Sequence, residues 1–253
     1  MIREKLSPRV AEIVIDDLVR NQRGLLRAAN RISAGFVKVT GAQQEKDMHT
    51  VLKLLQHPKK GIPELVISPL SFLAVVGMDG KVIARNAEPD HMKGMDFGGQ
   101  FPVVKRALAG ETGYAIAEFK SLAKGGDPSV TILMAAPARY RGEVVGALTL
   151  GIPLWRLQQQ LSRQLQADAA GKESGVVLWA YVYRGAELHR HGTPQDLDLM
   201  VPDVRARRAG YARSPGGFTG EVAQYGFWYG WGVRPLRVLG DDIGVVIFRM
   251  DPR

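Results

Sequence analysis

The strongest constraint on the fold is an internal repeat, because the two halves of the chain carry the same local signals in the same order. Each half has two β-prone segments joined at a turn, a helix with an early proline and a closing glycine, and three further β-prone segments. The paired segments are "FLAVVGMDGKVIARN" (72–86) and "GVVLWAYVYRGAELHRHG" (175–192), and the helices are "FPVVKRALAG" (101–110) and "VPDVRARRAG" (201–210). Such a shared order predicts the duplication of one α/β unit.

The first repeat predicts an antiparallel sheet of about five strands. Asp79-Gly80 lies between two β-prone runs, which is a strong signal for a hairpin whose two central turn residues both have positive φ. The segment "YAIAEFK" (114–120) alternates in polarity, and "TILMAAPARYRGEVVGALTLGI" (131–152) predicts two strands that meet at Arg141-Gly142. The helix at 101–110 falls between the second and third strands.

A long helix precedes the repeats. Apolar residues between Val10 and Val39 recur at steps of three, four and seven, which is the spacing of one helical face. Ser7-Pro8 is a good start for this helix, with serine as the cap. About thirty residues at 1.5 Å each would make it roughly 45 Å long. Further amphipathic helices are predicted around 43–56 and in "PLWRLQQQLSRQLQADAA" (153–170).

Composition restricts the class of protein. The chain has a net charge of +9 and no cysteine, which excludes disulfides, thiolate metal sites and cysteine nucleophiles. Its first residues place charges on both sides of short apolar pieces, so they lack the apolar core of a signal peptide. No apolar run approaches the ~20 residues of a membrane helix. We therefore expect the sequence as given to be cytoplasmic.

Three segments resemble the Cache family, the PAS-like sensor modules of bacterial receptors, in which a long helix precedes one or two such units. They are "VVGMDGKVIARN" (75–86), "GMDFGGQFPVVKRALAGETG" (94–113) and "AAPARYRGEVVGALTLGIPL" (135–154). The resemblance implies a small-molecule ligand, a homodimer formed through the N-terminal helix, and a signalling partner protein. It also implies an alternative location, as an extracytoplasmic sensor fragment without its membrane anchors. The R-x-W-Y element of amino-acid-binding relatives is absent, since "FWY" (227–229) lacks the arginine.

The predicted fold class is therefore α+β, with a long N-terminal helix followed by two PAS-like units, each an antiparallel sheet of about five strands with flanking helices. We expect an N-terminal helical segment (1–64), a first Cache-like unit (65–154), a linker helix (155–174) and a second, degenerate unit (175–253). The second unit matches the family in its layout more than in its residues.

Candidate ligand-binding residues gather on the first predicted sheet. They are Arg85 and Asn86 at the end of the hairpin, Tyr114 on the third strand, and Arg139, Tyr140 and Thr149 on the last two. Arginine matches the paired oxygens of a carboxylate or phosphate, so the expected ligand is anionic. For any single arginine, an exposed charge at a strand end is the simpler interpretation. The small alternate residues Ala147, Thr149 and Gly151 would admit either a helix or a ligand close to the sheet.

Two other sites were weighed. His189 and His191, two apart on a predicted strand, share a face and could begin a metal site with Asp196 or Asp198. Without a clear third ligand we expect no metal and no cofactor. Alternate residues of 227–234 carry aromatic side chains, which can stack bases but more often form a core.

A basic stripe on the long helix supports the competing interpretation. The arginines that form it are Arg20, Arg23, Arg27 and Arg31. It could bind nucleic acid or an acidic protein, although a solvated helix face explains it as well. No metalloprotease, nucleophile-elbow or phosphate-loop motif occurs, so we expect no enzyme. The favoured hypothesis is a sensor of a small, anionic metabolite that relays occupancy through its long helix. A basic module that docks on a protein or nucleic acid is the alternative.

Overall fold

The computed structural model describes residues 7–38, 40–120, 129–170, 175–224 and 226–250. The chain divides into two units, one continuous in the sequence and the other built from two separate segments. The N-terminal unit is Asp17–Pro153, and the C-terminal unit combines Met1–Asp16 with Leu154–Arg253. Helix α1 (Ser7–Ile32) therefore contributes its first turns to the C-terminal unit and the remainder to the N-terminal unit.

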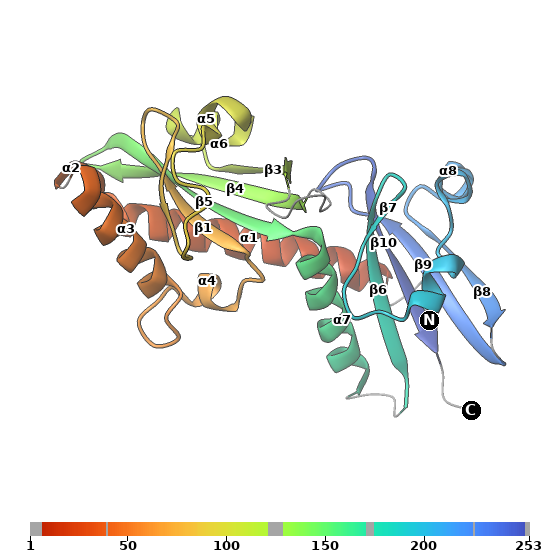
Figure 1. Cartoon of the computed structure of the whole chain (residues 1–253). Helices are drawn as coiled ribbons and strands as arrows, with labels where there is room; N and C mark the ends of the chain where they lie inside the picture. The colour runs from red at the N-terminus through yellow and green to blue at the C-terminus, as the bar shows by residue number, and fades with distance from the viewer. Residues whose placement is uncertain (1–6, 39, 121–128, 171–174, 225, 251–253) are drawn as a thin grey trace. The chain divides into compact units, whose positions relative to one another are not determined.

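The N-terminal unit is one antiparallel sheet flanked by helices (Figure 1). Its helices are α2 (Gly35–Lys38), α3 (Gly41–Leu55), α4 (Pro63–Ile67), α5 (Phe97–Gln100) and α6 (Pro102–Leu108). Its strands are β1 (Phe72–Val76), β2 (Val82–Arg85), β3 (Gly113–Phe119), β4 (Ser129–Tyr140) and β5 (Glu143–Pro153). The strand order is β2-β1-β5-β4-β3. Helix α6 packs on β3, β4 and β5, while α3 packs on β1 and β2.

The C-terminal unit repeats this plan. Its helices are α7 (Leu154–Ala170), the 3₁₀-helix η2 (Gln195–Met200) and α8 (Val204–Arg213). Its strands are β6 (Val177–Arg184), β7 (Glu187–His189), β8 (Phe218–Gln224), β9 (Phe227–Pro235) and β10 (Ile243–Met250). The strand order, β7-β6-β10-β9-β8, is that of the first sheet when each strand is replaced by its counterpart. The predicted duplication and the predicted α+β class are both confirmed.

The long helix is shorter than predicted. Helix α1 ends at Ile32, and a turn at residues 33–34 separates it from α2. The hydroxyl of Ser33 donates a hydrogen bond to the carbonyl of Asn30 at 2.8 Å, which gives the backbone a local alternative to continued helix. The predicted end at Val39 lies outside the described residues, as do residues 171–174 of the predicted linker helix.

The first hairpin turn also differs from the prediction. Of Asp79-Gly80, only Gly80 has positive φ, at 80°, and the β1–β2 connection spans residues 77–81. The amide of Gly80 donates to the carbonyl of Gly77 at 2.9 Å, so the tight turn starts one residue earlier than expected. Positive φ at both central residues occurs instead at Arg141 (53°) and Gly142 (93°), between β4 and β5. That pair has the backbone that a two-residue hairpin requires.

Candidate functional site

The end of the first hairpin holds its two predicted ligand-binding residues in structural contacts. The guanidinium of Arg85 donates to the carbonyl of Pro89 at 2.6 Å, and its Nε lies 3.5 Å from the carboxylate of Asp90. Asn86 accepts from the amide of Leu73 at 2.8 Å and donates to Gln56 at 2.5 Å. Arg85 thus closes the loop after β2, and Asn86 ties β1, β2 and the end of α3 together.

Three of the other four predicted residues also have contacts within the unit. Thr149 is fully buried and donates to the carbonyl of Ala74 at 3.1 Å. Arg139 donates to the carbonyls of Gly142 and Gly110, both at 3.1 Å. The guanidinium carbon of Arg141 lies over the ring of the neighbouring Tyr140, 5.4 Å from the ring centroid.

Tyr114 and Thr149 lie on opposite faces of the sheet. Tyr114 pairs with Met134, which pairs in turn with Leu150. Successive residues of a strand point to opposite faces, so Leu150 shares the face of Tyr114, and Thr149 points to the other side. Burial raises the pKa of Tyr114.

The small residues of β5 accommodate protein rather than an open site. Ala147 belongs to the apolar core that includes Val103 and Val104 of α6. A Cβ on Gly151 would lie 2.1 Å from the ring of Phe72, its cross-strand partner. Of the two explanations offered by the sequence, close approach of a helix therefore applies at Ala147, and an aromatic ring occupies the space at Gly151.

A hollow of about 650 Å³ lies between helix α3 on one side and strand β2 on the other. The loop that follows β2 also lines it. We call it the α3–β2 hollow. Its lining residues are Ala42, Glu45, Lys46, His49, Thr50, Lys53, Leu54, His57, Ala84, Glu88 and Asp90. This volume falls within the range of small-molecule sites. Sequence patterns missed these residues, although the lining positions 46, 49, 50, 53 and 57 recur at the spacing of one polar helix face.

His49 connects the two walls of the α3–β2 hollow. Its Nδ1 lies 2.6 Å from the carbonyl oxygen of Arg85 and therefore acts as the donor, because a carbonyl only accepts. Its Nε2 lies 2.8 Å from a carboxylate oxygen of Glu88, and the other Glu88 oxygen lies 3.6 Å from Nζ of Lys53. The hollow thus holds charges of both signs, in contact across the gap between helix and loop.

The two histidines considered as a possible start of a metal site do not lie on one strand. His189 is the last residue of β7, and burial lowers its pKa. His191 lies beyond the strand, with its ring 5.4 Å from that of Trp155. The expectation of a shared strand face is therefore wrong, because the strand ends between them. Within the described ranges, no three histidine or acidic side chains gather as metal ligands would.

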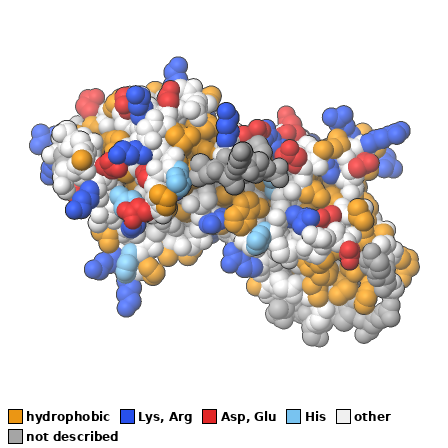
Figure 2. All heavy atoms as spheres, in the orientation of Figure 1, with side chains coloured by type: hydrophobic (Ala, Val, Ile, Leu, Met, Phe, Trp, Pro, Cys, Tyr) orange, Lys and Arg blue, Asp and Glu red, His pale blue; other side chains and the backbone are white. Residues whose placement is uncertain are grey.

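The basic stripe of α1 is largely engaged within the protein. Arg20 pairs with Asp17, and Arg27 pairs with Glu64 of α4. Arg31 donates to the carbonyl of Lys60 at 3.4 Å. Figure 2 shows basic and acidic side chains interspersed over the face drawn, with no single basic patch. Among the residues that the structure describes, no helix has both the length and the apolarity to cross a bilayer.

The second unit also has an apolar core, and this core contains several aromatic side chains. Tyr229 and Val233 of β9 pack with Tyr181 and Phe248, so this face of β9 is core, as the sequence favoured. Trp228, on the opposite face, remains 70% exposed.

Arg207 of α8 is 5% exposed within this aromatic region. It donates to the carbonyls of Pro202 and Gly185, and its guanidinium lies 4.1 Å from the centroid of the Tyr183 ring. Burial lowers the pKa of Arg207. These contacts fasten α8 to the β6–β7 turn.

Comparison with known proteins identifies the fold. No protein-family model and no curated protein matches the sequence. The sensor domain of the histidine kinase DctB from V. cholerae has a TM-score of 0.54 at 13% identity, covering 97% of this chain and 94% of that chain. The ligand-binding domain of the Campylobacter jejuni chemoreceptor Tlp3, in complex with L-valine, has a TM-score of 0.58 at 12% identity, covering 96% and 89%.

A third similar structure is the extracellular domain of a protein described as a histidine kinase, rpHK1S-Z16. Its TM-score is 0.51 at 11% identity, with 98% of this chain and 92% of that chain covered. All three are sensory domains, and all three match over both units rather than over one. The chain therefore has the tandem PAS-like fold of the Cache-type sensor domains.

Proposed function

We propose that this chain is a ligand-binding sensory module and that the α3–β2 hollow holds its ligand. The observation that carries the proposal is a hollow of about 650 Å³ within the N-terminal unit, lined by charged side chains from two different elements. A few convergent polar groups in a concave site are typical of small-molecule binding. The fold alone would not support this conclusion, because one fold serves many functions.

The lining favours a carboxylate ligand. Lys46, Lys53 and His57 can attract a carboxylate, while Glu45 and Glu88 can accept from an ammonium group. The expected anionic metabolite fits the first set, and a zwitterion such as an amino acid fits both. The Tlp3 domain in complex with L-valine is a precedent for a zwitterionic ligand on this fold. We therefore propose a small carboxylate-bearing metabolite, with plain acids and amino acids as the two forms to compare.

The proposed transmission of ligand occupancy depends on the position of the hollow between α3 and β2. A ligand carboxylate that attracts Lys53 or a ligand ammonium that attracts Glu88 would replace the contact between them, which measures 3.6 Å. Such a ligand would bind the two arrangements of helix and loop with different affinity, which is the condition for a signal. We propose that the module acts through α1 on a second copy or a partner protein, at an apolar pair formed by Val19 and Leu26, which are 39% and 38% exposed.

The same proposal includes a non-enzymatic role and an extracytoplasmic location. The similar structures are described as sensor, ligand-binding or extracellular domains, which supports both points. The alternative, a basic module that docks on an acidic partner, is less favoured because three arginines of its stripe already have partners: Arg20, Arg27 and Arg31.

A thermal-shift screen of organic acids and amino acids tests the proposal. A ligand at 100 times its Kd adds about 2.7 kcal/mol to the free energy of unfolding, or very roughly 5–10 °C. We expect Lys53→Gln and His49→Gln to reduce the shift, while Lys105→Gln, an exposed lysine of α6, leaves it unchanged. A ligand whose shift is the same in all three variants would refute the assigned site. Binding only to polyanions, weakening steeply with salt, would instead favour the alternative.

A further inference from the structure

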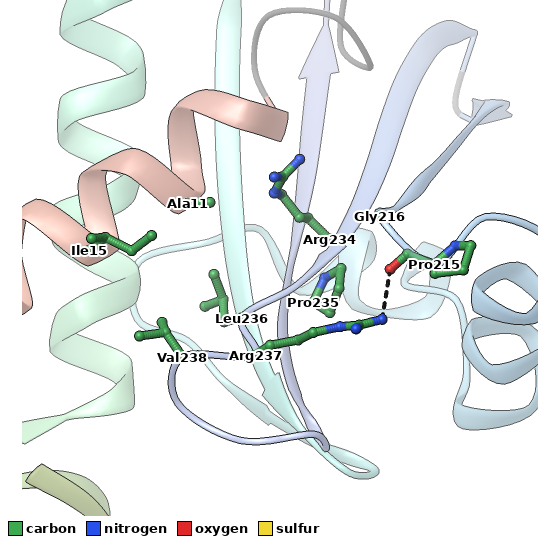
Figure 3. A pocket seen from close by; sticks show the side chains of 9 residues that line it. All are labelled: Ala11, Ile15, Pro215, Gly216, Arg234, Pro235, Leu236, Arg237 and Val238. Carbon is green, nitrogen blue, oxygen red and sulfur yellow. Dashed lines mark hydrogen bonds between the residues drawn. The ribbon is translucent and has the colours of Figure 1, made fainter.

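The C-terminal unit contains a second concavity, which no part of the proposed sensor function uses. It has a volume of about 350 Å³ and lies between the first turns of α1 and the loops at the ends of β8 and β9. Its lining residues are Ala11, Ile15, Pro215, Gly216, Arg234, Pro235, Leu236, Arg237 and Val238 (Figure 3). We call it the arginine-rimmed pocket. All of these residues belong to one unit of the chain.

One side of the arginine-rimmed pocket is apolar. Ile15, Leu236 and Val238 lie together there, as Figure 3 shows. Ile15 is 46% exposed and Val238 is 37% exposed, whereas Leu236 is only 2% exposed. These three aliphatic side chains form an apolar surface. An apolar group of a ligand that packs against this surface is removed from water. Burial of such surface is the main source of affinity for a hydrocarbon group.

The other side carries two positive charges. Arg237 donates to the carbonyl of Pro215 at 3.3 Å, which is a long hydrogen bond to an uncharged acceptor (Figure 3). In the part of the chain that the structure describes, neither Arg234 nor Arg237 forms an ion pair with a carboxylate. Two guanidinium groups beside an apolar wall therefore present charge that the described residues leave unbalanced.

We propose that the arginine-rimmed pocket binds a small carboxylic acid with an apolar tail. The carboxylate would pair with Arg234 and Arg237, because the planar guanidinium fork matches its two oxygens. The tail would lie against Ile15, Leu236 and Val238. The occupant is a free acid in solution rather than a membrane surface, since the site is a small concavity and not an extended face. The proposal does not rest on the α3–β2 hollow, which belongs to the other unit.

Occupancy of this pocket would join two parts of the unit that are far apart in the sequence. Ala11 and Ile15 come from α1, and the remaining lining residues come from positions 215–238. A bound acid would therefore add contacts between α1 and the β9–β10 connection. Because the ligand binds only when these two parts lie together, its binding free energy stabilises their contact.

Sodium octanoate is the probe for the test, with octan-1-ol as the control for the tail and sodium acetate as the control for the head. Amide NMR spectra of the full chain are recorded during titration of octanoate and acetate to about 10 mM, a range suited to small ligands, and of octanol up to its solubility in water. We expect saturable shifts for octanoate at Ile15 and at residues 234–238, with weaker binding of octanol and none of acetate.

Matched variants locate the contacts. Arg234→Gln and Arg237→Gln should each weaken octanoate binding by about three- to tenfold, which is the effect of one charged hydrogen bond at a partly exposed site. Arg208→Gln removes an exposed arginine of α8 outside the pocket and should change nothing. Ile15→Ser should weaken binding, whereas Ile67→Ser, which changes an exposed isoleucine of α4 in the other unit, should not.

Four results would overturn the proposal. One is an octanoate affinity that is the same in Arg234→Gln and Arg237→Gln as in the control variant Arg208→Gln. Another is octanol binding as tightly as octanoate, which would exclude a role for the carboxylate. A third is association with phosphatidylglycerol vesicles in the absence of saturable octanoate binding, which would identify a membrane surface. Binding that is lost in Lys53→Gln would assign octanoate to the α3–β2 hollow and equally contradict the second site.

Discussion

Substitution of Gly151 by alanine should destabilise the N-terminal unit, because the ring of Phe72 occupies the space that a methyl group needs. An ideal Cβ at this position would lie 2.1 Å from Cε1 of Phe72 and 2.6 Å from its Cζ. The ring cannot simply turn away, since it is 3% exposed and contacts two other rings. Its centroid lies 6.3 Å from that of Phe97 and 5.4 Å from that of Phe119.

The expected loss is about 1–2 kcal/mol of unfolding free energy. Overpacking of a well-filled core costs typically about 1–3 kcal/mol, and alanine in place of a strand glycine recovers roughly 0.5–1 kcal/mol. For a unit of this size, the difference corresponds to a fall in Tm of roughly 3–8 °C. Urea unfolding should show a lower midpoint with an unchanged slope, because the substitution exposes no additional surface in either state.

Three companion variants separate this cause from a general intolerance of alanine. Gly113→Ala places a Cβ no closer than 3.6 Å to its neighbours and should stay within about 0.5 kcal/mol of the parent chain. Gly146→Ala meets the ring of Phe36, which is half-buried and has room to move, so its effect should be smaller than that of Gly151→Ala. In a Phe72→Leu background, Gly151→Ala should lose most of its cost. Unchanged stability of Gly151→Ala, or an equal cost in that background, would refute the packing argument.

Further predictions concern pH and the hairpin. Burial lowers the pKa of His189 below its usual value near 6.5, so stability should fall as pH decreases below about 6.5, and His189→Gln should weaken that dependence in acid unfolding curves. Burial raises the pKa of Tyr181 to about 12, so the folded state keeps a neutral phenol after the unfolded chain ionises near pH 10. Stability should therefore decline between about pH 10 and 12, and a Tyr181→Phe variant that declines as steeply would contradict this assignment. Asn86→Ala removes hydrogen bonds to Leu73 and Gln56 and should cost about 1–3 kcal/mol in urea unfolding; no loss would show that water replaces them fully.

The repeated architecture could be predicted because its signals are local. Alternating polarity, turn glycines and helix boundaries act over a few residues, and their order along the chain determines which strands become neighbours. The two sheets have corresponding strand orders although their residues differ widely. The error at Asp79-Gly80 has the same local origin, because the favourable dipeptide lies in a loop of five residues, which reaches its turn geometry with one glycine at positive φ.

The candidate site could not be predicted, because it depends on how α3 docks against β2. His49 contacts the backbone carbonyl of Arg85, 36 positions away, and a backbone acceptor leaves no trace in a sequence pattern. The charge of Arg85 makes its side chain a candidate ligand-binding group in the sequence, yet Asp90 lies close enough to balance that charge. Such pairing depends on the path of the loop after β2 rather than on residue type.

The divided C-terminal unit has a consequence for synthesis on the ribosome. Val10, Ile13 and Val14 of α1 are buried, and they belong to the unit whose remaining residues begin at Leu154. At translation rates of roughly 5–20 residues per second, on the order of 10 s separates the emergence of the two pieces. During that interval the apolar face of the start of α1 is exposed to solvent, because the residues that bury it have not yet been synthesised. Binding of a chaperone to nascent chains should therefore persist at residues 7–16 until the last strands emerge.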